Sequence, residues 1–168
     1  MYKVIYFTNI FPHYRKALWE EILNSEQFNI TIYCSKNNPL AIKESKSIDA
    51  FNFKKGKINY IEGFWLFKKI LIWQKSVLTI CTSNTFDSII FLGEVNVLSN
   101  WLGALICRFR RKKVFFWSHG LYGNESLLKY FFRKLFYKIA DEHIVYENRG
   151  RNLMINSGFK PQKVHVIY

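Results

Sequence analysis

The sequence has few acidic residues and few residues that interrupt secondary structure. Its 168 residues include 12 Asp and Glu against 25 Lys and Arg, a net charge of +13, with only 3 Pro and 8 Gly. This composition excludes a collagen-like or Pro/Gly-rich linker, and the 49% hydrophobic residues exclude an intrinsically disordered chain. A chain of this length typically buries roughly 70% of the surface that it exposes when unfolded. We therefore expect one domain over residues 1–168.

Cysteine is also scarce. The three cysteines, Cys34, Cys81 and Cys107, lie far apart and form no C-x-x-C pair. This excludes a disulfide framework, predicts no metal site, and favours a reducing, cytoplasmic location. Charged or polar residues interrupt every apolar run before it reaches the roughly 18 to 20 residues that cross a bilayer. Any membrane contact would then be peripheral, at the inner face of the membrane.

Short apolar runs of strand length alternate with segments of helical period. The sequence predicts strands over residues 2–8, 29–34, 58–61, 87–92, 113–117, 143–146 and 164–168. This alternation is typical of an α/β protein. We expect a three-layer, Rossmann-like, doubly wound and mainly parallel sheet with helices on both faces.

The common motifs of nucleotide binding and hydrolysis are missing from the sequence. It contains no G-x-G-x-x-G, P-loop, G-x-S-x-G or H-E-x-x-H motif. An open α/β sheet binds its ligands just past the carboxyl ends of its strands, so polar residues at three predicted strand ends are the candidates. For binding a hydroxyl-bearing or phosphate ligand these candidates are Asn9, Pro12, His13, Tyr14, Arg15, Glu94, Asn96, Gly120 and Asn124.

His119 is the candidate catalytic residue. It lies between an apolar strand and a turn that contains Gly120 and Gly123, and Asn124 could cap the helix that follows. An imidazole in this place can donate a hydrogen bond to a phosphate or sugar oxygen. The alternative is that it only stabilises its own turn. His143 lies within a predicted strand, so we expect it to pack in the core.

Two segments combine cations with aromatic residues. A helix predicted over residues 64–81 places Lys68, Lys69 and Lys75 on one face with Trp65 and Ile72. A second helix, over residues 126–140, has a predicted buried stripe of Leu128, Phe131, Phe132, Leu135, Phe136 and Ile139. Its predicted outer face carries Lys129, Tyr130, Arg133, Lys134, Tyr137 and Lys138.

These outer faces predict docking to an anionic membrane surface, because the rings enter the interface while the cations stay at the headgroups. A solvated face is the plain alternative. A basic α/β module that binds nucleic acid is another, although no motif for nucleic-acid recognition accompanies the charge.

Several segments together resemble the N-terminal half of a family 4 glycosyltransferase, which has the two-domain GT-B fold. They include FTNIFP at 7–12, FFWSHG at 115–120 and YKIAD at 137–141. In this family the N-terminal domain binds the acceptor, and the C-terminal domain binds the sugar nucleotide and carries a Glu-x7-Glu motif. The sequence has no such motif and ends in a strand-like run, so we expect that the donor-binding domain is absent and that this chain alone is inactive.

The resemblance implies metal-independent, retaining transfer of a sugar from a nucleotide-sugar donor to a polysaccharide or lipid-linked acceptor, with no cofactor. The histidine that the family places near the transferred sugar corresponds to His119. Many members have paired glycines in the first loop, where this chain has Pro12, His13, Tyr14 and Arg15. A stand-alone nucleotide-binding module is the remaining alternative.

Overall fold

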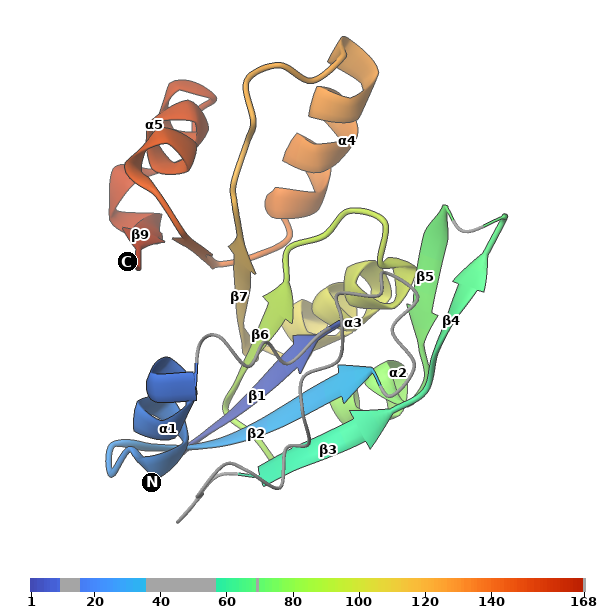
Figure 1. Ribbon diagram of the computed structural model, residues 1–168, viewed down its shortest axis with the longest axis vertical. Helices are drawn as coiled ribbons and strands as arrows, with labels where there is room; N and C mark the ends of the chain where they lie inside the picture. The colour runs from blue at the N-terminus through green and yellow to red at the C-terminus, as the bar shows by residue number, and fades with distance from the viewer. Residues whose placement is uncertain (10–15, 36–56, 69, 168) are drawn as a thin grey trace.

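The computed structural model describes residues 1–9, 16–35, 57–68 and 70–167. Its centre is a seven-stranded parallel sheet with the order β3-β2-β1-β6-β7-β8-β9 (Figure 1). The strands are β1 (Tyr2–Thr8), β2 (Phe28–Ser35), β3 (Lys57–Ile61), β6 (Ser88–Leu92), β7 (Lys113–Ser118), β8 (Glu142–Val145) and β9 (Val164–Val166). The predicted α/β class and parallel sheet are confirmed.

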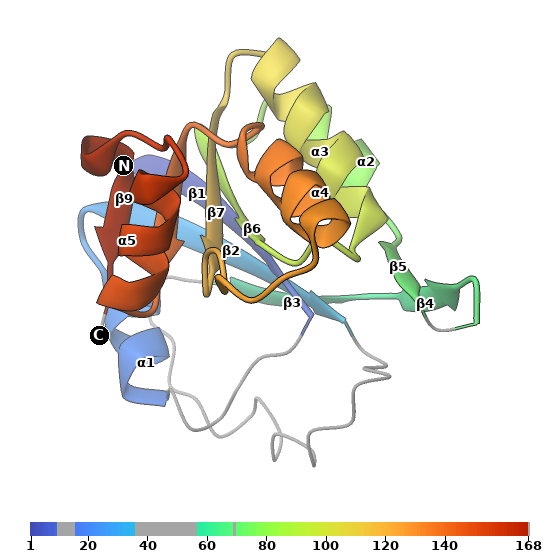
Figure 2. The same cartoon turned by 90° about the horizontal axis from the view of Figure 1, so that it is seen from above.

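Helices cover both faces of the sheet (Figure 2). They are α1 (Lys16–Asn24), α2 (Val77–Cys81), α3 (Leu98–Phe109), α4 (Leu127–Tyr137), α5 (Asn148–Asn156) and the short 3-10 helix η3 (Pro161–Lys163). From β1 the chain adds β2 and β3 in one direction, and later adds β6, β7, β8 and β9 in the other. Right-handed crossovers therefore place α1 on the face opposite to α3, α4 and α5.

Each face has its own core. On one face, Phe7, Phe91 and Phe116 of three adjacent strands pack with residues of α2, α3, α4 and α5. On the other face, Trp19 of α1 packs with Tyr6 and Trp117, whose ring centroids lie 5.4 Å apart. The alternation of side chains along a strand thus explains why these strands read as continuous apolar runs, since both of their faces are buried.

The helix predicted over residues 64–81 is wrong. This segment forms a hairpin of β4 (Gly63–Leu66) and β5 (Leu71–Gln74), followed by the short helix α2. A short apolar run rich in aromatic residues fits a strand as well as a helix, and tertiary pairing decides between them. Here the backbone N–H of Ile72 donates to the carbonyl oxygen of Asn96 at 2.8 Å.

The hairpin breaks up the predicted basic face. Ile72 is buried in the core and Trp65 is half-buried, so the two do not form an exposed pair. Lys68 is exposed at the turn of the hairpin, and Lys75 is exposed and forms an ion pair with Glu62. The side chain of Lys69 lies outside the described residues.

Helix α4 exists as predicted, but its buried face is not the predicted one. Leu128, Phe131, Phe132 and Leu135 are exposed, and of the predicted buried stripe only Phe136 is fully buried, with Ile139 half-buried. Tyr137 is buried instead. The remaining residues of the predicted outer face divide: Arg133, Tyr130 and Lys134 are half-buried, whereas Lys129 and Lys138 are exposed.

The buried face of α4 differs from the predicted one because Tyr137 and Arg133, which the sequence places outside, find polar partners within the fold. The ring of Phe136 stacks on Phe116 with centroids 4.3 Å apart, and the hydroxyl of Tyr137 donates within the fold. A tyrosine can be buried where its hydroxyl has an acceptor. Sorting residues into apolar and charged sets could not reveal those acceptors.

Candidate functional site

The order of strands reverses at β1, so the carboxyl ends of β1 and β6 flank the place where an open α/β sheet binds ligands. Thr8 and Asn9 at the end of β1 are both buried. The side-chain amide of Gln74 donates to the carbonyl oxygen of Thr8 at 3.1 Å and to the hydroxyl of Ser35 at 3.0 Å. Gln74 therefore connects the hairpin to the ends of β1 and β2.

Three buried amide oxygens at this edge have no hydrogen-bond partner among the described residues: Asn9 Oδ1, Gln74 Oε1 and Asn100 Oδ1. The Nδ2 group of Asn100 donates to the carbonyl oxygen of Leu92 at 3.0 Å, at the end of β6. An unpaired buried oxygen has a cost, which a bound water or ligand hydroxyl would relieve. These oxygens give the edge unused capacity to accept hydrogen bonds.

The ends of β6 and β7 are in close contact. A Cβ atom on Gly93 would lie 2.7 Å from the Cβ atom of Ser118, so only glycine fits there without a shift of the backbone. The buried hydroxyl of Tyr137 lies 3.2 Å from the carbonyl oxygens of both Gly93 and Gly120. Burial raises the pKa of Tyr137 to about 12, so the phenol stays protonated and donates.

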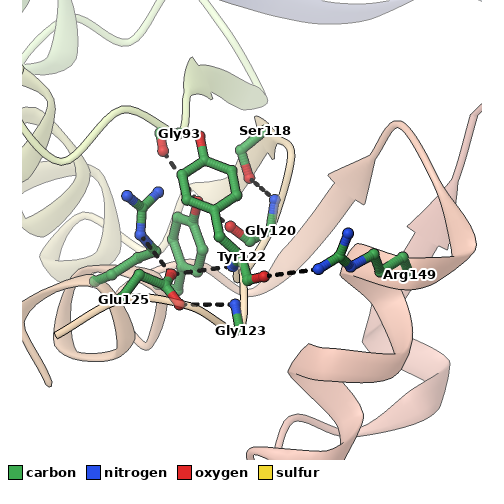
Figure 3. Close-up of polar contacts among 9 residues, drawn as sticks. Gly93, Ser118, Gly120, Tyr122, Gly123, Glu125 and Arg149 are labelled. Carbon is green, nitrogen blue, oxygen red and sulfur yellow. Dashed lines mark hydrogen bonds and ion pairs between the residues drawn. The ribbon is translucent and has the colours of Figure 1, made fainter. Parts of the chain in front are cut away.

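A network of polar contacts fixes the loop after β7 (Figure 3). The carboxylate of Glu125 accepts hydrogen bonds from the backbone N–H groups of Tyr122 at 3.0 Å and Gly123 at 2.8 Å. It also forms an ion pair with Arg133 of α4, whose guanidinium lies over the ring of Tyr122. Burial acts to raise the pKa of Glu125, but the N–H donors and the Arg133 charge outweigh burial and lower it.

His119 follows β7 and is exposed. Its ring centroid lies 4.7 Å from that of Tyr146 and 6.4 Å from that of Tyr122. Its carbonyl oxygen meets the first turn of α5, where a Cβ atom on Gly150 would lie only 2.2 Å away. The backbone at His119 is therefore held between the Glu125 loop and α5, while the imidazole faces outward from the edge of the sheet.

The structure brings together some of the predicted site residues and not others. Glu94 and Asn96 are half-buried just after β6, and Gly120, with φ of 74°, follows His119. Asn124 is exposed, and α4 begins after Ser126 with no side-chain cap, so the expected cap by Asn124 is wrong. Pro12, His13, Tyr14 and Arg15 lie outside the described residues.

The prediction that His143 packs in the core is confirmed, since it is 2% exposed. The sequence pattern predicts no site role for Glu125 or Gly150, and it places Arg133 and Tyr137 on an outer surface. A carboxylate within a glycine-containing turn was the only available signal for Glu125. Its partner, Arg133, follows eight residues later on a helix, and no spacing rule predicts an ion pair at that separation.

This arrangement presents one exposed imidazole beside two aromatic rings, on a rigid backbone, at the carboxyl edge of a parallel sheet. Such a group can bind a hydroxyl or a phosphate oxygen and orient it. Within residues 1–9, 16–35, 57–68 and 70–167, no three His, Cys, Asp or Glu side chains lie close enough to hold a metal ion. In the same ranges, no helix combines the length and the apolar character needed to span a membrane.

No protein-family model matches the chain, and no curated protein matches it in sequence. Solved structures do resemble it. A UDP-N-acetylglucosamine 2-epimerase from Rickettsia bellii has a TM-score of 0.62 and 17% sequence identity, over 99% of this chain and 44% of that one. The lipopolysaccharide outer core galactosyltransferase WaaB has a TM-score of 0.56 and 14% identity, over 99% of this chain and 45% of that one.

Both of these proteins have the GT-B fold, and this chain spans less than half the length of either. The likeness shows the fold: the chain is a Rossmann-like domain of the kind found in GT-B proteins. Membership of glycosyltransferase family 4 stays a prediction.

Proposed function

We propose that this chain is the acceptor-binding half of a retaining, metal-independent glycosyltransferase. The enzyme would move a sugar from a nucleotide-sugar donor to a polysaccharide or lipid-linked acceptor. The observation that carries the proposal is the exposed imidazole of His119 at the carboxyl end of β7. WaaB, whose name gives it as a galactosyltransferase of lipopolysaccharide, supports the same class of reaction through its fold.

In this proposal the residues of the sheet edge have separate tasks. His119 contacts the transferred sugar or the acceptor hydroxyl, and Gly120 and Gly150 allow the close approach of backbone that holds His119 in place. Asn9, Glu94 and Asn96 accept or donate hydrogen bonds to acceptor hydroxyls. The donor is bound mainly by a second domain.

The test measures transfer by the complete gene product. The complete gene product is incubated with a membrane fraction of the source organism and with a donor whose sugar is radiolabelled. The donors are UDP-galactose, UDP-glucose and UDP-N-acetylglucosamine, each used separately. Label is then counted in the lipid and polysaccharide fractions. We expect transfer from one donor, reduced by about 100-fold or more in His119→Ala, as for loss of a group that acts directly on the reacting atoms. The matched control is His165→Ala, because His165 is also exposed but lies on β9. Undiminished transfer by His119→Ala would contradict the proposed role.

A sugar-nucleotide epimerase is the second candidate, because the epimerase fold gives the higher TM-score. An epimerase would convert labelled UDP-N-acetylglucosamine to an isomer with no membrane fraction present. A transferase would instead require the acceptor. Chromatography of the nucleotide sugars from the incubation without membranes therefore separates the two candidates.

A further inference from the structure

The outer face of α4 is apolar and exposed. Leu127 is 88% exposed, Leu128 67% and Phe131 60%, and Phe132 and Leu135 are each close to half exposed. At about 100° per residue these five side chains fill a sector of about 140°, opposite the sector that holds Arg133 and Tyr137. We call these five residues the α4 apolar face.

A second apolar stripe runs along the neighbouring helix. Leu102, Leu105 and Phe109 of α3 are spaced by three and four residues, and Phe109 is 90% exposed. Helix α4 contacts α3 through one pair of rings, because the ring centroids of Trp101 on α3 and Phe136 on α4 are 4.7 Å apart. The exposed stripe therefore belongs to a helix that is in contact with α4.

The charge around this surface is positive. Residues 98–138 contain nine Lys and Arg and one acid, Glu125, so the segment carries 9 − 1 = +8 of the chain's net charge of +13. The carboxylate of Glu125 is already paired with Arg133. Lys134 and Lys138 border the α4 apolar face, and Arg110 and Arg111 follow α3 and are exposed. The surface is thus apolar in the middle and cationic at its border.

Soluble proteins rarely expose a contiguous apolar surface of this kind unless a partner or a membrane covers it. A bilayer with anionic lipids matches both of its properties, because the acyl boundary accepts leucine and phenylalanine while the headgroups attract the cations. Nucleic acid would match only the charge. A second copy of the chain would bring two strongly positive surfaces together, which like-charge repulsion opposes.

We infer that the α4 apolar face, together with the α3 stripe, docks the chain onto an anionic lipid bilayer, with α4 lying in the interface. The inference rests on the proposed function only in that it explains how a lipid-linked acceptor would be reached. It also reverses the orientation expected from the sequence, since the leucines and phenylalanines of α4, and not its tyrosines, enter the membrane.

The test is co-sedimentation of the 168-residue chain with vesicles of phosphatidylcholine, with and without phosphatidylglycerol. We expect binding to the anionic vesicles at least about tenfold stronger than to the neutral ones, weakening as salt is added. The variant Leu128→Gln/Phe131→Gln removes two apolar groups that α4 already exposes, so it leaves the core intact. It should reduce the affinity for anionic vesicles by at least about tenfold.

The matched control is Tyr60→Gln on β3, because Tyr60 is 52% exposed but lies on the opposite edge of the sheet. The control should bind like the unchanged chain. Equal binding by the double variant and the unchanged chain would overturn the inference, and so would no binding to either vesicle. Sedimentation velocity supplies the other outcome: a dimer that the double variant abolishes, without vesicle binding, would assign the surface to a second copy and overturn the inference.

Vesicle binding needs no catalysis, so its failure is separate from failure of the proposed function. In the complete gene product, Leu128→Gln/Phe131→Gln should keep its transfer to acceptor dissolved in detergent and lose transfer to acceptor held in vesicles. Loss of both activities in a folded double variant would contradict a role confined to docking.

Discussion

Stability should fall in mild acid because of one buried histidine. The imidazole of His143 is enclosed by rings, with centroids 5.2 Å from Phe159 and 5.6 Å from Tyr137. Burial lowers the pKa of His143 from 6.5 to about 4, with Glu142 acting in the opposite direction. The folded state thus keeps this ring neutral over a range of pH in which the unfolded chain would protonate it.

The sign and size of the effect follow from proton linkage. Because the folded pKa is the lower one, the unfolded chain binds the proton first as the pH falls, and the folded state loses stability between pH 6.5 and about 4. One pKa unit corresponds to about 1.4 kcal/mol, so the full effect is about 3 kcal/mol. Between about pH 7.5 and about pH 4.5 the loss from this group should be about 2.5 kcal/mol.

The measurement is urea unfolding across this pH range for the unchanged chain and for His143→Leu, which keeps an apolar group of similar size. The free energy of unfolding of the variant should gain about 2.5 kcal/mol on that of the unchanged chain as the pH falls from about 7.5 to about 4.5. The matched control, His119→Leu, changes an exposed imidazole and should stay within about 0.5 kcal/mol of a constant difference. A constant difference for His143→Leu as well would contradict this prediction, because the folded state would then accept the proton freely.

Two further predictions concern the loop that holds His119. Gly150→Ala should cost about 1 to 3 kcal/mol in urea unfolding, because its Cβ atom would lie 2.2 Å from the carbonyl oxygen of His119. Asn152→Ala, on the exposed side of the same helix, is the control, and equal stability of the two variants would show that no close contact exists. Tyr137→Phe should cost about 1 to 2 kcal/mol by the same assay, because it removes the donor to two backbone carbonyl oxygens. Tyr122→Phe, at an exposed ring, should cost much less, and equal costs would argue against the buried hydrogen bonds.

The fold class and most of the sheet can be predicted from the amino-acid sequence alone. The central strands β1, β6 and β7 are largely buried on both faces, so their residues form continuous apolar runs that stand out from the helices between them. The run over residues 2–8 coincides with β1. The position of His119, directly after such a run and before a glycine, likewise placed it at the carboxyl edge of the sheet, where the structure has it exposed.

The conformation of residues 63–74 and the choice of which face of α4 is buried depend on contacts between distant parts of the chain. The first depends on pairing with the segment around Asn96, far along the chain, which local periodicity does not contain. The second depends on the partners of two side chains of α4. Tyr137 donates to the carbonyl oxygen of Gly93 at the end of β6, and Arg133 pairs with Glu125 in the loop after β7. Apolar side chains of α4 were left outside because polar ones found partners within, and a sequence pattern records which residues are apolar but not which polar groups will meet.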